Sequence, residues 1–76
     1  MYTPTTEQLE RITKKDFVYH KPKEGQAERY SDIRRRFSEL AVMLCSECPQ
    51  SRELSIAMTK LEESVMWANA AIARNE

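Results

Sequence analysis

A chain of 76 residues with two cysteines and one histidine is at most one small domain, and it has too few cysteines for a disulfide framework. A chain this short buries only about 60% of its unfolded surface, so we expect self-association to complete the fold. Twelve basic and twelve acidic residues cancel, which argues against the broadly basic surface that non-specific binding to duplex nucleic acid needs.

Charge is unevenly distributed along the chain. Residues 1–10 carry −2, residues 11–36 carry nine bases against four acids (+5), and residues 37–76 carry three bases against six acids (−3). The local positive excess predicts a confined anionic ligand. No apolar run is long enough for a signal peptide or a membrane span, so we expect a soluble intracellular protein with free thiols.

The N-terminal part, residues 1–16, is expected to form a short helix. After Pro4, the threonines at positions 5 and 6 offer a hydroxyl N-cap, and Glu7 places an acid in the first turn. Leu9 and Ile12 are the only apolar anchors of this segment. They predict that the helix docks on the main body of the protein as one or two turns.

Residues 17–25 are expected to connect this helix to the next one. The segment lacks a helical period and contains Pro22 and Gly25, which is the only glycine in the chain. We expect the Phe-Val-Tyr sequence at residues 17–19 to be extended and to pack across the surface of the protein.

Two long helices follow, over residues 26–48 and 51–74. Apolar residues recur in both at steps of three and four. The first stripe comprises Tyr30, Ile33, Phe37, Leu40 and Leu44, and the second comprises Leu54, Met58, Leu61, Val65, Ala68 and Ile72. Pro49 ends the first helix and Ser51 caps the second. Helices joined by so short a turn fold back antiparallel, which predicts an all-α fold of a short N-terminal helix plus a long two-helix hairpin.

The second long helix carries more apolar surface than one partner helix can cover. Met66, Trp67, Ala70 and Ala71 extend the stripe around its C-terminal half. The chain has no third long element to cover this patch, and such a patch is a liability in water. Alanines permit close approach of helices and tryptophan is a frequent interface anchor. We therefore expect these four residues to form the subunit interface of a homo-oligomeric helical bundle.

Cys45 and Cys48 form a C-x-x-C pair in an unfavourable setting for chemistry. Redox pairs of this kind lie at helix N-termini, where the helix dipole activates the thiol, whereas this pair ends a helix. A zinc site needs about four ligands, and the chain has no second pair. Structural thiols are the favoured interpretation, and a metal site shared between symmetry-related copies is the alternative.

No catalytic set is visible in the sequence. His20 has no evident nucleophile to assist, and there is no Gly-rich phosphate loop. Glu62 and Glu63 are interpreted as a solvated helix face rather than an acid–base pair. We therefore expect neither an enzyme nor a cofactor or metal requirement.

Residues 17–23 interleave aromatic and basic side chains. Aromatic rings can stack on nucleobases while lysine and arginine neutralise phosphates, although plain surface packing is the alternative. Arg34 lies one turn beyond Tyr30 on the same helix face, in a basic run that could also be merely solvated. A second anion site is suggested beside Arg52, where the helix after Ser51 exposes free backbone N–H groups. Ordinary capping is the alternative there.

Several motifs together resemble those of a known family. They are Phe17-x-Tyr19-His20-x-Pro22-Lys23, Gln26, Arg29-Tyr30-x-x-Ile33-Arg34, Leu40-Ala41, Pro49-x-Ser51-Arg52-Glu53, Thr59-x-Leu61-Glu62-Glu63 and the final run from Met66 to Asn75. On these motifs the chain is similar to the phage-encoded anti-CBASS cyclic-nucleotide sponges, whose hairpin is shared with the anti-Thoeris sponges. The resemblance covers about residues 17–75.

The resemblance implies a function that composition does not indicate. Members of the family form hexamers that bind cyclic oligonucleotide second messengers without cleaving them, in the cytoplasm of the infected bacterial host. Cyclic dinucleotides such as 3′,3′-cGAMP bind between paired protomers, and cyclic trinucleotides bind on three-fold axes. On matching positions, the resemblance assigns the dinucleotide pocket to Tyr19, His20, Lys21 and Arg34, and the trinucleotide pocket to Ser51 and Arg52.

Three other functions stay open at the level of sequence. One is an oligomeric helical adaptor that binds another protein through the basic segment. Another is an anti-Thoeris sponge for cyclic ADP-ribose isomers, which is less favoured because the chain is shorter than the members with an added β-domain. The last is binding of single-stranded nucleic acid, against which the balanced net charge argues.

Overall fold

The computed structural model describes residues 1–76 and contains four helical segments. They are α1 (Thr6–Arg11), the π-helical segment η1 (Ile12–Asp16), α2 (Gln26–Glu47) and α3 (Arg52–Asn75). No strand is present, which confirms the predicted all-α class. The long helices were expected over 26–48 and 51–74, so their observed ends differ from these ranges by about one residue.

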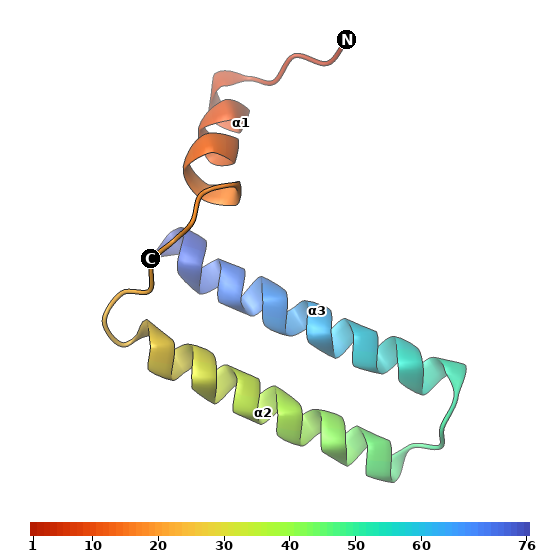
Figure 1. Ribbon diagram of the computed structural model, residues 1–76. Coiled ribbons are helices and arrows are strands. Elements are labelled where there is room, and N and C mark those ends of the chain that lie inside the picture. Colours follow the sequence, from red (N-terminus) through yellow and green to blue (C-terminus); the bar gives the residue numbers. More distant parts are fainter.

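α2 and α3 lie side by side and antiparallel, joined by the turn at residues 48–51 (Figure 1). The residues of both predicted stripes are half-buried between the two helices, except Leu40, which is 38% exposed. Cys48 has an extended backbone, as expected for a residue before proline. The Ser51 hydroxyl accepts a hydrogen bond from the Leu54 N–H at 3.1 Å and so caps α3. The predicted hairpin is confirmed.

α1 begins with the expected threonine cap but does not dock on the hairpin. The Gln8 N–H donates to the Thr5 hydroxyl at 3.1 Å, and the Gln8 side chain accepts from the Thr5 N–H at 2.8 Å. The helix then projects away from the end of the hairpin (Figure 1). Leu9 and Ile12 remain 47% and 37% exposed, so the prediction that they anchor α1 to the main body is wrong. Two apolar side chains offer too little area to hold a short helix against the hairpin.

The connector also packs less than expected. Phe17 and Tyr19 are each 82% exposed and Val18 is 43% exposed, so the prediction that these residues pack across the surface is wrong. The segment leads around the open end of the hairpin and does not run along either long helix (Figure 1). Gly25 then starts α2 with a φ of +83°, in the left-handed region that glycine adopts without strain.

The chain forms no hydrophobic core of its own. No apolar residue is buried, and the only buried residue is Gln26, which is 3% exposed. The molecule measures 48 × 39 × 13 Å and its radius of gyration is 16.7 Å. A compact domain of this length has a radius of gyration of about 11 Å. The protomer is thus a flat, open hairpin, and no helix in it is both long and apolar enough to cross a bilayer.

Candidate functional site

The connector presents an aromatic and a basic side chain without polar partners in the chain. Tyr19 is 82% exposed and Lys21 is also exposed. His20 is half-buried instead, because its Nε2–H donates to the Lys15 carbonyl oxygen at 2.9 Å. That bond leaves Nδ1 as the free ring nitrogen. Tyr19 and Lys21 are therefore available to a ligand, while His20 helps to hold the connector on η1.

Arg34 differs from the two arginines that follow it. Arg35 and Arg36 both pair with Asp32 one turn earlier on α2, and their hydrogen bonds lower the pKa of that carboxyl. Arg34 donates only a long hydrogen bond of 3.4 Å to the Ser31 hydroxyl. It is thus the one arginine of the run that no carboxylate neutralises, as a phosphate-binding residue requires.

The turn carries the second predicted pair, Ser51 and Arg52. The Ser51 hydroxyl is fully used, since it accepts from the Leu54 N–H and donates to the Pro49 carbonyl, each at 3.1 Å. Arg52 is exposed and has no ion pair in the chain. Ser51 also lines a groove of about 510 Å³, together with Cys45 of α2 and residues at the start of α3. Any contribution of Ser51 to anion binding therefore comes through the helix N-terminus that it caps.

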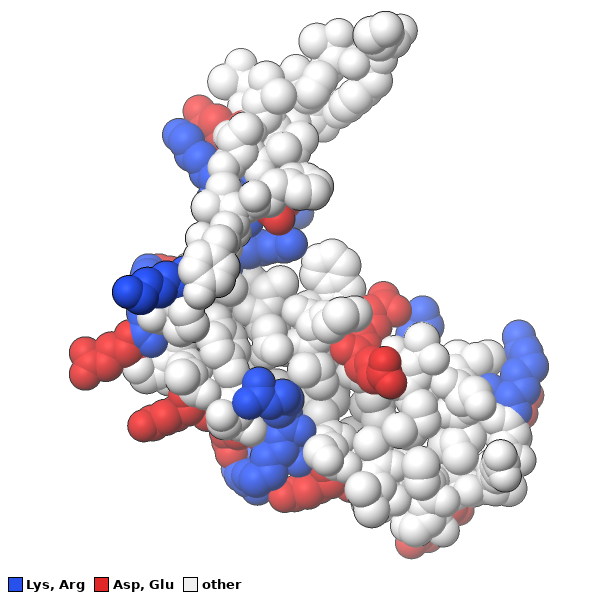
Figure 2. Space-filling model, in the orientation of Figure 1, with Lys and Arg blue, Asp and Glu red and all other residues white.

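The two predicted nucleotide sites lie toward opposite ends of the hairpin. α2 has 22 residues, which at about 1.5 Å per residue makes it about 33 Å long. Figure 2 shows lysine and arginine side chains toward both ends of the hairpin, with further charged side chains of both signs between them. Tyr19, His20, Lys21 and Arg34 line none of the three main clefts of the protomer. No main cleft of a single protomer therefore brings these four residues together.

The four predicted interface residues lie together on one face of α3. Met66 and Trp67 are 64% and 62% exposed, Ala71 is exposed and Ala70 is half-buried. Trp67 and Ala70 line two neighbouring clefts of about 570 and 470 Å³. The larger cleft lies between this face and the α1–η1 segment. The structure therefore gathers these residues on one part of α3, where Met66, Trp67 and Ala71 remain exposed in the protomer.

The profile of the Acb2/Tad1 hairpin domain matches residues 10–73. The chain belongs to the Acb2/Tad1 hairpin-domain family. The match spans the connector and both long helices and confirms the resemblance drawn from the motifs. It indicates sponge-type cyclic-nucleotide binding as the class of function. No curated protein and no solved structure gave a significant match.

Asp16 joins the N-terminal part of this Acb2/Tad1 hairpin to α3, a role that the sequence did not reveal. Its carboxylate pairs with Arg11 at 3.5 Å and with Arg74 at 3.8 Å. The Arg74 guanidinium in turn lies 5.9 Å from the centre of the Trp67 ring, within cation–π range. No periodic pattern in the sequence predicts the pairing of Asp16 with Arg74, because Arg74 lies almost at the other end of the chain.

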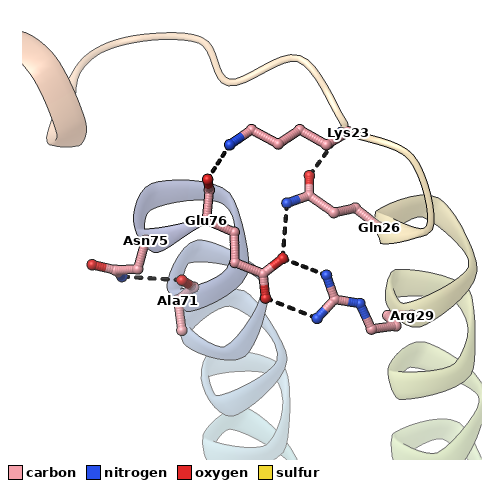
Figure 3. A network of polar contacts seen from close by, with 6 residues as sticks. All are labelled: Lys23, Gln26, Arg29, Ala71, Asn75 and Glu76. Atoms are coloured by element: carbon pink, nitrogen blue, oxygen red, sulfur yellow. Dashed lines mark hydrogen bonds and ion pairs between the residues drawn. The ribbon is translucent and has the colours of Figure 1, made fainter.

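A second cluster that sequence reasoning missed lies at the connector end of the Acb2/Tad1 hairpin. It consists of Lys23, Gln26, Arg29 and Glu76 (Figure 3). The antiparallel register contained a signal for it, since Gln26 and Glu76 are almost equally far from the turn.

The thiols of Cys45 and Cys48 are both free, and no three potential metal ligands lie together.

Proposed function

We propose that this chain is a non-catalytic sponge that sequesters cyclic oligonucleotide second messengers. By lowering the free messenger in the cytoplasm of the infected bacterial host, it blocks CBASS anti-phage signalling. The observation that carries the proposal is the Acb2/Tad1 hairpin match over residues 10–73, because it includes both candidate nucleotide-binding surfaces.

The connector surface suits a cyclic dinucleotide such as 3′,3′-cGAMP. Tyr19 offers an exposed ring for base stacking, which contributes about 1–3 kcal/mol per base. Lys21 and Arg34 carry charges that no carboxylate of the chain neutralises, and they can bind phosphates. A cyclic dinucleotide has near two-fold symmetry, so two protomers related by a two-fold axis present the same groups to both halves of the ligand.

The turn surface suits a cyclic trinucleotide. Arg52 is exposed beside the N-terminus of α3, where backbone N–H groups and the helix dipole favour an anion. Three copies of Arg52 around a three-fold axis would meet the three phosphates of such a ligand. The second site is therefore proposed on Arg52, with Ser51 contributing as the cap of the helix.

Self-assembly is part of the proposal. The protomer has no buried apolar residue, and Met66 and Trp67 remain exposed on α3. A homo-oligomer, proposed here as a hexamer, would bury this face and supply the missing core. It would also enclose the connector residues, which no main cleft of a single protomer includes.

Sequestration needs no acid, base or nucleophile, and two of the side chains that could supply them make contacts within the chain. The Nε2 of His20 is bonded to the Lys15 carbonyl. Glu63 pairs with Lys60 at 3.5 Å. The proposal is accordingly that the messenger leaves the protein chemically unchanged.

Thermal-shift titration against a panel of cyclic nucleotides tests the proposal. We expect a large stabilisation by 3′,3′-cGAMP or cyclic triadenylate, and recovery of intact messenger after denaturation of the complex. Recovery of linear nucleotide would indicate an enzyme. Stabilisation by cyclic ADP-ribose isomers alone would indicate an anti-Thoeris sponge. No shift with any member of the panel would favour the protein-binding adaptor.

A further inference from the structure

The most buried side chain of the molecule is polar and bridges the connector to the end of α3. Gln26, at the start of α2, is 3% exposed. Its Oε1 accepts the Lys23 N–H at 2.8 Å, and its Nε2 donates to the Glu76 Oε1 at 3.1 Å (Figure 3). Both ends of the amide are therefore satisfied, one by the connector backbone and the other by Glu76.

Glu76 is the centre of this network. The Arg29 guanidinium binds its carboxylate in the bidentate manner, with Nη1 donating to Oε2 at 2.8 Å and Nη2 donating to Oε1. The Lys23 ammonium donates to the Glu76 backbone oxygen. The hydrogen bonds from Arg29 and, next, from Gln26 lower the pKa of the Glu76 carboxyl to about 2. One residue thus holds the connector, α2 and the end of α3 together.

The connector has few other contacts that fix its position. Residues 18–23 form no regular structure, and their aromatic side chain is exposed. The remaining tie is the hydrogen bond between His20 and the Lys15 carbonyl. A segment with so few contacts samples many conformations unless it is fastened at both ends. Lys23 lies only two residues beyond Lys21, so the network fastens the segment that carries the proposed dinucleotide-binding residues.

We propose that Glu76 is a positioning residue for the dinucleotide surface. It fastens the connector to the open end of the hairpin and so presents Tyr19 and Lys21 in one arrangement. Glu76 itself does not contact the ligand. The inference rests on the proposed function, because it assigns Glu76 to the same surface.

Electrostatics and positioning make opposite predictions for Glu76. Removing a carboxylate near a basic surface strengthens the binding of an anion if charge alone matters. If positioning matters, the same change weakens binding, because the connector spends less time in the competent arrangement. A competent fraction of about one tenth lowers the apparent affinity about tenfold. The sign of the effect therefore separates the two explanations.

The test uses the full chain with Glu76→Gln and the matched control Glu24→Gln. The amide at position 76 replaces one acceptor by a donor and so breaks the bidentate pair with Arg29. Glu24 is exposed, adjoins Lys23 and has no ion pair, so its substitution removes the same charge from the same end of the hairpin. Dissociation constants are measured for 3′,3′-cGAMP and cyclic triadenylate, with hydrogen exchange at the Lys23 amide as a readout that needs no ligand.

We expect Glu76→Gln to weaken binding of 3′,3′-cGAMP about tenfold and to raise the exchange rate at Lys23, with binding of cyclic triadenylate unchanged. Glu24→Gln should bind 3′,3′-cGAMP as well as the wild type or better. Equal or tighter binding by Glu76→Gln would overturn the positioning role and leave the proposed function intact. Loss of both ligands would also overturn it, because the change would then have damaged the protomer or its assembly. A wild-type protein that binds neither ligand would overturn the proposed function and this role together.

Discussion

Arg34 and Arg52 are the arginines whose surroundings most favour a bound phosphate. Their neighbours in the basic run of α2, Arg35 and Arg36, already share the carboxylate of Asp32. A ligand that approached those neighbours would compete with an existing ion pair. Arg34 and Arg52 have no carboxylate partner, so a phosphate gains their full charge.

Substitution of Tyr19 and Arg52 should separate the two nucleotide sites. Tyr19→Ala removes a stacking ring and should weaken binding of a cyclic dinucleotide roughly 5- to 150-fold, which corresponds to about 1–3 kcal/mol per base. Binding of cyclic triadenylate should not change. Arg52→Ala should have the reverse effect, and isothermal titration calorimetry with both ligands measures each affinity. Equal loss of both ligands in either variant would mean one shared site or a damaged oligomer.

Glu76 should make stability depend on pH in the acid range. Its pKa lies at about 2 in the folded chain, against an ordinary value of 4.5. Since folding favours the ionised form, the stabilisation is fully present above the ordinary pKa and is lost as pH falls through about 2. Both partners of the Arg29–Glu76 pair are exposed to solvent, which screens the pair and keeps the effect modest.

Melting temperatures of the wild type and of Glu76→Gln, measured across this acid range, check the expectation. The wild type should be the more stable near neutral pH, and the difference should shrink as the Glu76 carboxyl is protonated. A difference that stayed constant down to the lowest pH would show that the carboxylate charge contributes nothing to stability.

At the scale of the elements, the link between connector and α2 depends on the backbone of Gly25. Its φ of +83° is the only positive value in the chain, and a Cβ at this position would meet no atom within 4 Å. Gly25→Ala should therefore destabilise the protein by about 1–2 kcal/mol through backbone strain alone. Gly25→Asn should cost less, because asparagine tolerates the left-handed region. Urea unfolding at a fixed protein concentration measures both, and equal stability of Gly25→Ala and wild type would contradict the account.

Sequence predicted the elements whose signals are local. The three- and four-residue steps identified both arms of the hairpin, and Thr5 and Ser51 cap the helices that follow them. The docking of α1 and the packing of Phe17 were wrongly predicted, because apolar character does not say which surface will cover a residue. The Glu76 network depends on the register of two distant helix ends, so its signal lies in the predicted hairpin and not in a local pattern around Glu76.

At the scale of the whole molecule, the flat protomer leaves Trp67 as the largest exposed side chain of α3. Trp67→Ala should impair assembly before it affects either nucleotide site. Loss of an interface tryptophan that contributes at least about 2 kcal/mol makes dissociation of the oligomer about 30-fold more favourable. Analytical ultracentrifugation over a range of concentrations should show smaller species for Trp67→Ala. Val42→Ala, at an apolar residue of α2 that is 67% exposed, should assemble like the wild type. Identical behaviour of Trp67→Ala and wild type would exclude the α3 face as the interface.

We propose above all that the chain assembles into an oligomer and that this oligomer binds its messenger without altering it. Native mass spectrometry of the full chain with 3′,3′-cGAMP or cyclic triadenylate measures assembly and binding at once. The account predicts a hexamer that carries the messenger, and release of that messenger at its original mass when the complex is dissociated. A protein that stays monomeric and binds neither ligand, or one that releases a linear or hydrolysed product, would contradict it.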